Sequence, residues 1–137
     1  MTDIRHVVTS FLRFQGKILL LQRSSRVGTY QGQWAGCSGY IEGNEVPYDR
    51  AIIEIWEETK LTEDQVTLIK KGDPIEIIDE GKGITWIVHP FLFEIVTDQI
   101  QLDWEHKNYK WIPPDELSNF QTVPKLKETY EQVQNSS

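Results

Sequence analysis

Apolar residues at the start of the chain follow a pattern typical of β-strands. Residues 4–14 are rich in β-branched and aromatic side chains, and residues 17–23 form a second apolar run. Gln15-Gly16 lies between them as a turn signal, so we predict a β-hairpin. The polar, glycine-containing residues 24–33 predict a loop, and residues 34–38 predict a short strand.

Residues 46–59 carry the clearest helical pattern. Pro47 suits a first helical turn, because its missing N–H would have no partner there. Glu45 precedes the helix, where a negative charge favours the helix dipole. At about 100° per residue, one arc is mainly apolar and the opposite arc carries carboxylates. We therefore predict one core-facing side, with Trp56 in the core, and one acidic side.

The second half of the chain is predicted to be mainly β-structure. Strands are expected at residues 65–70, 75–79, 84–96 and 108–112. Pro90 predicts that the long strand lies at an edge or contains a bulge, because proline cannot donate to a β-ladder. A helical turn near residues 115–117 and a helix over residues 124–134 follow. This order of elements predicts an α+β protein or a sandwiched α/β/α layout.

Length and composition are those of one globular domain. The chain has 137 residues, of which 39% are hydrophobic and 26% are charged, so we expect a single domain over residues 1–137. A domain of this size can bury a core without disulfides or a structural metal. Cys37 is the single cysteine and excludes an internal disulfide. We expect it to be a buried small residue.

The net charge of −7 limits the classes of partner. Proteins that bind nucleic-acid polymers or anionic membranes usually carry an excess of Lys and Arg, so neither partner is expected. Nucleotides remain open as substrates, because a metal ion can supply local positive charge. The sequence contains no signal-peptide pattern and no apolar run that approaches a membrane span, and we expect a cytoplasmic protein.

Glu54, Glu57 and Glu58 would share one patch of the predicted helix, because residues three and four apart are neighbours on a helix surface. The pattern alone favours a solvated acidic face, with Arg50 as a partner for Glu54. The alternative is a divalent-cation site, since hard cations such as Mg²⁺ prefer carboxylate oxygens and can join them to phosphates.

The surrounding residues favour the cation site. Gly39 is followed after five residues by Glu45, and seven residues later comes the segment 53–61, IEIWEETKL. This spacing resembles the Nudix box, G-x5-E-x7-R-E-U-x-E-E-x-G-U, where U is a bulky aliphatic residue. The predicted loop–helix–loop is the context that the motif requires. The segments 17–39 and 104–117 also resemble the corresponding family segments, although they are less specific.

Two box positions depart from the family pattern. Ile53 stands where the family has arginine, and Lys60 stands where it has glycine. Our hypothesis is that Arg50, one turn before Glu54, partly replaces the missing arginine, because a guanidinium group can pair with carboxylates in a bidentate way. A left-handed cap at Lys60 would cost roughly 1 kcal/mol more than at glycine. We therefore expect a different loop conformation after the helix.

The resemblance implies a Nudix-type α/β/α sandwich with a mixed sheet and a metal-dependent hydrolase. The reaction would cleave the pyrophosphate bond of a small nucleoside diphosphate derivative, such as a nucleotide, a nucleotide sugar, ADP-ribose or a dinucleoside polyphosphate. Mg²⁺ or Mn²⁺ would be held mainly by Glu57 and Glu58, with Glu54 as a third ligand and the Gly39 carbonyl completing the site. The general base would be Glu54, Glu58 or Glu105.

Substrate contacts are predicted before the box. Arg23, at a strand end, is a candidate for phosphate binding, and Tyr30 and Trp34 are candidates for stacking, although aromatic residues at such positions more often belong to the core. Two alternatives to the hydrolase stay open: a Nudix domain that senses a nucleotide with little turnover, and an isomerase of the isopentenyl-diphosphate type, which Cys37 would suit. The particular substrate and the formation of a homodimer are left open.

Overall fold

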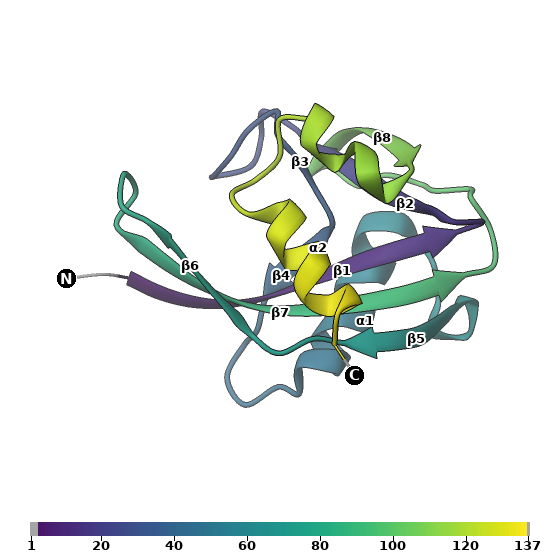
Figure 1. Ribbon diagram of the computed structural model, residues 1–137, viewed down its shortest axis with the longest axis horizontal. Helices are drawn as coiled ribbons and strands as arrows, with labels where there is room; N and C mark the ends of the chain where they lie inside the picture. The colour runs from purple at the N-terminus through teal and green to yellow at the C-terminus, as the bar shows by residue number, and fades with distance from the viewer. Residues whose placement is uncertain (1–2, 137) are drawn as a thin grey trace.

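Eight strands form one mixed sheet within residues 3–136, the part of the chain that the computed structural model describes (Figure 1). The strands are β1 (Asp3–Phe14), β2 (Lys17–Arg23), β3 (Trp34–Ala35), β4 (Cys37–Tyr40), β5 (Val66–Lys71), β6 (Ile75–Asp79), β7 (Ile84–Ile95) and β8 (His106–Ile112). The helices are α1 (Pro47–Thr59) and α2 (Leu126–Gln134), with short 3-10 helices at Glu63–Gln65 and Pro114–Asn119. None of the helices in the described range is long and apolar enough to cross a membrane.

The two longest strands, β1 and β7, lie side by side at the centre of the sheet. They pair in parallel, whereas all other strand pairs are antiparallel. The strand order along the sheet is β3-β2-β1-β7-β5. In addition, β4 pairs with β1, β6 pairs with β7 and β8 pairs with β2. The predicted first hairpin is confirmed: Arg13 pairs with Ile18, and Gln15 and Gly16 take the left-handed conformation of a tight turn.

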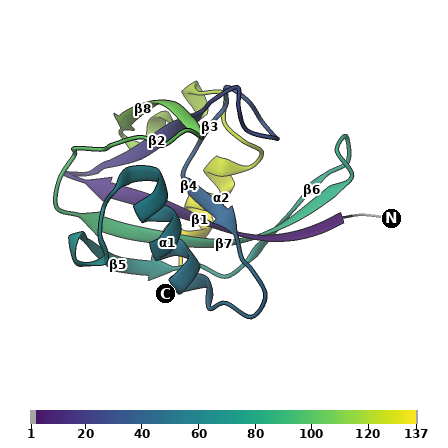
Figure 2. The same cartoon turned by 180° about the vertical axis from the view of Figure 1, so that it is seen from behind.

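The helices cover opposite faces of the sheet, as Figures 1 and 2 show from opposite sides. Successive residues of a strand point to opposite faces, so the continuous apolar run of β2 supplies both layers. Leu19 and Leu21 pack in the core under α1, whereas Ile18 and Leu20 pack in the core under α2. The predicted α/β/α sandwich with a mixed sheet is confirmed.

Pro90 was predicted to mark an edge strand or a bulge, and the edge alternative is wrong. β7 is a central strand, with β1 on one side and both β5 and β6 on the other. Pro90 lies where the neighbour changes from β6 to β5, and Gly72, in the connection between those strands, donates its N–H to the Pro90 carbonyl at 2.9 Å. A missing N–H costs little at this point because the neighbouring ladder is interrupted there.

Helix α1 is turned differently from the prediction. Trp56, expected in the core, is 47% exposed, whereas Glu54 and Glu58 are buried beside Ala51 and Ile55. We expected the chain to avoid a left-handed cap after the helix, and this prediction is also wrong. Lys60 takes φ 66° and its N–H bonds to the Trp56 carbonyl. The helix therefore turns two carboxylates toward the sheet.

Candidate active site

Strand β4 and helix α1 meet where Glu54 lies against Gly39. A Cβ added to Gly39 would overlap the carboxyl group of Glu54, so only glycine leaves room for that side chain here. The predicted strand at residues 34–38 is divided at Gly36, where a Cβ would come within 2.8 Å of the Ser10 carbonyl oxygen. The two glycines thus let β4 run close to both β1 and α1.

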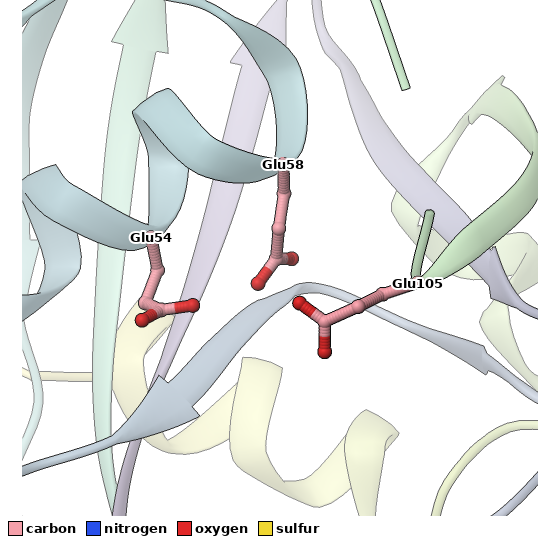
Figure 3. Close-up of side chains that lie close together, drawn as sticks. All are labelled: Glu54, Glu58 and Glu105. Atoms are coloured by element: carbon pink, nitrogen blue, oxygen red, sulfur yellow. The ribbon is translucent and has the colours of Figure 1, made fainter. Parts of the chain in front are cut away.

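Three carboxylates from two distant segments converge at this point (Figure 3). One oxygen from each of Glu54, Glu58 and Glu105 lies within 4.8 Å of the other two. Glu54 and Glu58 come from α1, and Glu105 comes from the loop that precedes β8. Glu57, predicted as a principal ligand, is exposed and is not a member of this group. The structure therefore brings Glu105, which was predicted from outside the box, next to two of the four box glutamates.

Burial and repulsion raise the pKa of each of the three carboxyl groups. Burial is the main cause at Glu58, whose pKa lies well above its ordinary value, and the charges of Glu54 and Glu105 add to the shift. Burial also raises the pKa of Glu54, although Arg50 opposes it. Burial and then Asp103 raise the pKa of Glu105. A bound divalent cation would favour the charged forms, so this set of donors fits a hard metal ion.

Arg50 connects two of the box glutamates, as the sequence led us to hypothesise. Its Nε and one Nη atom donate to the Glu45 carboxylate at 2.9 and 2.8 Å, and its other Nη atom donates to Glu54 at 2.9 Å. Glu45 also accepts the backbone N–H of Glu42 at 2.7 Å. Ile53, at the family's arginine position, is 38% exposed. Arg50 thus holds Glu54 in place from a position one turn earlier.

Replacing Arg50 by Lys is expected to weaken Mg²⁺ binding about 10–100-fold, the usual cost of losing a group that orients a metal ligand. Lysine keeps the charge but cannot pair with both carboxylates in a planar fork. Arg13→Lys is the matched control, because Arg13 pairs with Glu94 on the surface at 2.7 Å. Calorimetric titration with Mg²⁺ measures both variants. Equal affinity in Arg50→Lys and the wild type would contradict the role of Arg50.

His106 is buried at the start of β8, beside Glu58. Its Nδ1 lies 2.8 Å from Asp103 Oδ1, and its Nε2 lies 3.8 Å from Glu58 Oε1. The backbone N–H of Ser38 donates to the same Glu58 oxygen at 3.3 Å. Burial by itself would raise the pKa of Asp103. The hydrogen bond with His106 outweighs burial and holds this pKa below its ordinary value. Of these groups, the Ser38 N–H bonds directly to Glu58, and His106, held by Asp103, lies next to the same oxygen.

A pocket of about 140 Å³ opens beside the three carboxylates. Glu105 and Gly39 form part of its lining, as do Arg23 and Tyr30, two of the predicted substrate contacts. Arg23 is held by a hydrogen bond from its Nε to the Thr29 carbonyl at 2.9 Å. The pocket therefore places a cationic side chain and an aromatic ring within the space that borders the acidic group.

The third predicted contact, Trp34, lies elsewhere. It is 9% exposed, packs edge-on against Phe120 with ring centroids 5.6 Å apart, and is not among the residues that line the pocket. Tyr40 and Trp86 line the pocket instead. Tyr40 follows the box glycine, Gly39, in the sequence, and this position could have identified it. Trp86 lies in a long apolar run, where the sequence gives no sign of a pocket residue.

Comparison with family models identifies the family, and comparison with solved structures shows the fold. The family model described as NUDIX domain matches residues 3–133. Among solved structures, the chain is similar to a MutT protein from Methanosarcina mazei Go1, with TM-score 0.80, 23% identity, and coverage of 95% of this chain and 92% of that one. A MutT NUDIX hydrolase from Burkholderia pseudomallei gives TM-score 0.76, 23% identity, and coverage of 96% and 98%.

A C. elegans Ap4A hydrolase gives TM-score 0.73, 21% identity, and coverage of 96% and 94%. No match was found among curated proteins. These structural identities are low and show a common fold, whereas the family model covers nearly the whole chain. Together with the box residues that converge on one acidic group, the match shows that the chain belongs to the Nudix family of hydrolases.

Proposed function

We propose that the protein is a metal-dependent Nudix hydrolase that cleaves the pyrophosphate bond of a small nucleoside diphosphate derivative. The observation that carries the proposal is the convergence of Glu54, Glu58 and Glu105, of which Glu105 lines a pocket that is also lined by Arg23. The net charge of −7 favours a small substrate over a nucleic-acid polymer. We also propose a cytoplasmic location, and a homodimer remains an open alternative.

The three converging glutamates are the proposed ligands of Mg²⁺ or Mn²⁺. Their oxygen atoms are close enough to share one ion, and hard cations prefer such donors. The Gly39 carbonyl and the exposed Glu57 remain proposed additional ligands. When bound, the ion would neutralise charge on the phosphates and lower the pKa of a coordinated water.

The protein's own groups divide the remaining tasks. Glu105 borders both the carboxylate group and the pocket, so we propose that one of its carboxylate oxygens would hold the ion and the other accepts the proton of the attacking water. Arg23 lines the same pocket, and its guanidinium group would bind a phosphate. His106 and the Ser38 N–H orient Glu58, while Arg50 orients Glu54. This arrangement positions a diphosphate beside a base.

The two alternatives are less well supported. A sensing domain was suggested by the altered box positions, but Arg50 pairs with the box glutamates and Lys60 adopts the left-handed cap. An isomerase was suggested by Cys37, but that thiol is 1% exposed and burial raises its pKa well above its ordinary value. A protonated, inaccessible thiol cannot act on a substrate in the pocket.

A panel of pyrophosphate compounds tests the proposal directly. It should contain nucleoside triphosphates, nucleotide sugars, ADP-ribose and dinucleoside polyphosphates, each with Mg²⁺ and with Mn²⁺. Metal-dependent release of a nucleoside monophosphate from at least one compound is the expected result. Tight binding of a nucleotide without turnover of any compound would favour the sensing domain instead.

Magnesium is expected to stabilise the protein more at about pH 8 than at about pH 5. Burial raises the carboxyl pKa values of Glu54, Glu58 and Glu105, so the folded metal-free protein binds more protons than the unfolded chain between the ordinary and the raised values. Stability from these groups is therefore lost as the pH rises through that window. Magnesium binds the deprotonated form of the folded protein and so restores stability, by about 2.7 kcal/mol at 100 times the Kd.

Thermal unfolding with and without MgCl₂ at both pH values measures this effect. NaCl at matched ionic strength is the control for screening. An equal magnesium-induced change in Tm at the two pH values would contradict the assignment of these carboxylates as ligands.

A further inference from the structure

The pocket beside the acidic group has an aromatic wall built from three separate segments. Tyr30 comes from the loop after β2, Tyr40 ends β4, and Trp86 lies in β7. The rings of Tyr40 and Trp86 are stacked, with centroids 6.1 Å apart and planes at 29°. Tyr30 lies 6.1 Å from Trp86 at 51°. Aromatic and apolar surfaces of this kind favour a planar ligand group.

The β6–β7 hairpin and the neighbouring strand β1 supply the apolar side of the same pocket. Val7 of β1, Ile77 of β6 and Val88 of β7 are buried together with Trp86 and also line the pocket. In Figure 1 the β6–β7 hairpin projects away from the rest of the sheet beside the start of β1. The pocket thus lies between this extension and the acidic group near β4.

The polar atoms of the three aromatic side chains bond within the protein. The Tyr30 hydroxyl donates to Asp79 at 2.7 Å and accepts the Trp86 Nε1–H at 3.0 Å. The Tyr40 hydroxyl accepts a hydrogen bond from Arg5 at 3.0 Å. Cations already lie over two of the rings: Arg5 is 5.6 Å from the centre of the Trp86 ring, and Lys82 Nζ is 5.3 Å from that of Tyr30. The Tyr40 ring is 48% exposed, so its ring surface, rather than a polar atom, is the main recognition surface of this wall.

The hydroxyl side chains on the pocket wall are engaged in the same way. Thr9 and Ser38 bond to each other at 3.1 Å, and Thr129 donates to the Lys125 carbonyl at 2.8 Å. Strong discrimination between similar ligands requires buried polar groups that the wrong ligand would leave unpaired. Where such groups are already paired inside the protein, the wrong ligand incurs little penalty.

The backbone of Tyr30 supports a functional role for this wall. Tyr30 takes φ 51°, in the left-handed region that is unfavourable for a bulky residue. Such strain persists where the surrounding structure holds it, and it is concentrated at binding sites. Here the bonds to Asp79 and Trp86 hold the ring against the pocket.

We propose that this pocket binds the base of the substrate by stacking and apolar contact, and that it accepts purines and pyrimidines with little selection between them. The proposal rests on the proposed hydrolase function and adds the rule by which substrates are chosen. Every base offers an aromatic face, so stacking tolerates changes at the hydrogen-bonding edge. Selection would then depend on the diphosphate, which Arg23 and the acidic group would contact, and on the presence of a planar ring.

The test uses four sugar nucleotides that differ only in base: ADP-, GDP-, UDP- and CDP-glucose. With Mg²⁺, the expected values of kcat/KM agree within about tenfold. Tyr40→Ala should raise KM for all four by about tenfold, the loss expected for one base–aromatic contact, with a smaller effect on kcat. Tyr40→Phe keeps the ring and should raise KM much less than Tyr40→Ala. Preference for one base by more than about 100-fold would overturn the proposal.

Ile78→Ala is the matched structural control, because Ile78 is 61% exposed and lies next to the pocket residue Ile77 on the opposite face of β6. It should leave KM unchanged. If Tyr40→Phe lost as much affinity as Tyr40→Ala, the hydroxyl group and not the ring face would be the determinant, and the proposal would fail.

Binding to the metal-free protein separates this inference from the hydrolase function. AMP, GMP, UMP and CMP are titrated by calorimetry, with ribose 5-phosphate as the ligand that lacks a base. Similar affinity for the four nucleotides, weakened equally by Tyr40→Ala, supports the stacking pocket even if no pyrophosphate compound is hydrolysed. Hydrolysis accompanied by equal binding of ribose 5-phosphate and the nucleotides would support the enzyme and overturn the pocket.

Discussion

Glu58→Gln is expected to lower turnover by at least about 100-fold while leaving the protein folded. Glu58 is 1% exposed, and its carboxylate lies within 4.8 Å of those of Glu54 and Glu105. Glutamine has almost the same shape but lacks the negative charge that holds a cation. Losing even a group that orients a metal ligand costs about 10–100-fold, so losing a ligand should cost more.

The same variant is expected to be less active but, without metal, more stable than the wild type, and thermal unfolding measures this stability. Burial and neighbouring charges raise the pKa of Glu58, so the metal-free protein is destabilised by this group when it is ionised. Glu58→Gln should therefore unfold at a higher temperature than the wild type in EDTA at about pH 8, and should gain less from added Mg²⁺. A variant that is inactive because it misfolds would instead unfold at a lower temperature.

Two further glutamine variants complete the comparison. Glu76→Gln, on an exposed residue of β6, should have no effect and is the matched control. Glu57→Gln tests the proposed additional ligand, because Glu57 is exposed and lies outside the three converging carboxylates. Full activity in Glu58→Gln, measured with the best compound of the panel, would contradict the assignment of the acidic group as the active site.

Gly39→Ala is expected to lower Mg²⁺ affinity and turnover by about 100-fold. The new Cβ would occupy the space that the Glu54 carboxyl group now fills, so Glu54 must move away. That movement would break its hydrogen bond with Arg50 and separate it from Glu58 and Glu105. A displacement of about 1 Å in a catalytic group can reduce the rate by about 10²-fold. Only the end of the flexible Glu54 side chain meets the new Cβ, so the protein should remain folded.

Gly28→Ala is the matched control for this change. Nothing lies within 4 Å of a Cβ at Gly28, and its φ is not in the left-handed region. If Gly39→Ala acts through Glu54, its effect on Mg²⁺ affinity should be largely absent in a Glu54→Gln background, since variants that share one interaction are not additive. Additive losses in the double variant would show that Gly39 acts by another route.

Much of the fold followed from local sequence patterns. The first hairpin, helix α1 and the long strand β7 were predicted close to their observed bounds, because hydrophobic periodicity, turn residues and capping residues act over a few neighbouring positions. The role of Pro90 was mispredicted, since the strand that runs beside a proline is set by distant segments. Trp56 was misplaced for a related reason: periodicity defines arcs on a helix but not the rotation of the helix on the sheet.

The candidate site likewise has features that local spacing predicts and features that depend on tertiary contacts. The spacing of Gly39, Glu45, Glu54, Glu57 and Glu58 was enough to indicate the Nudix box from the sequence alone, because one loop and one helix carry it. The box does not show which of its glutamates turn inward. That choice depends on the contact between α1 and β4, where Gly39 makes room for Glu54.

The sequence by itself determined the family, the order of strands and helices, and the identity of the acidic residues, since these depend on residue types at short spacings. Only the tertiary structure decided that Glu105 and His106 meet Glu58, and that Tyr40 and Trp86 share one pocket. Residues so far apart in the chain are brought together by the pairing of strands and the packing of helices on the sheet. No local pattern encodes those distances, because they result from the burial of the whole core.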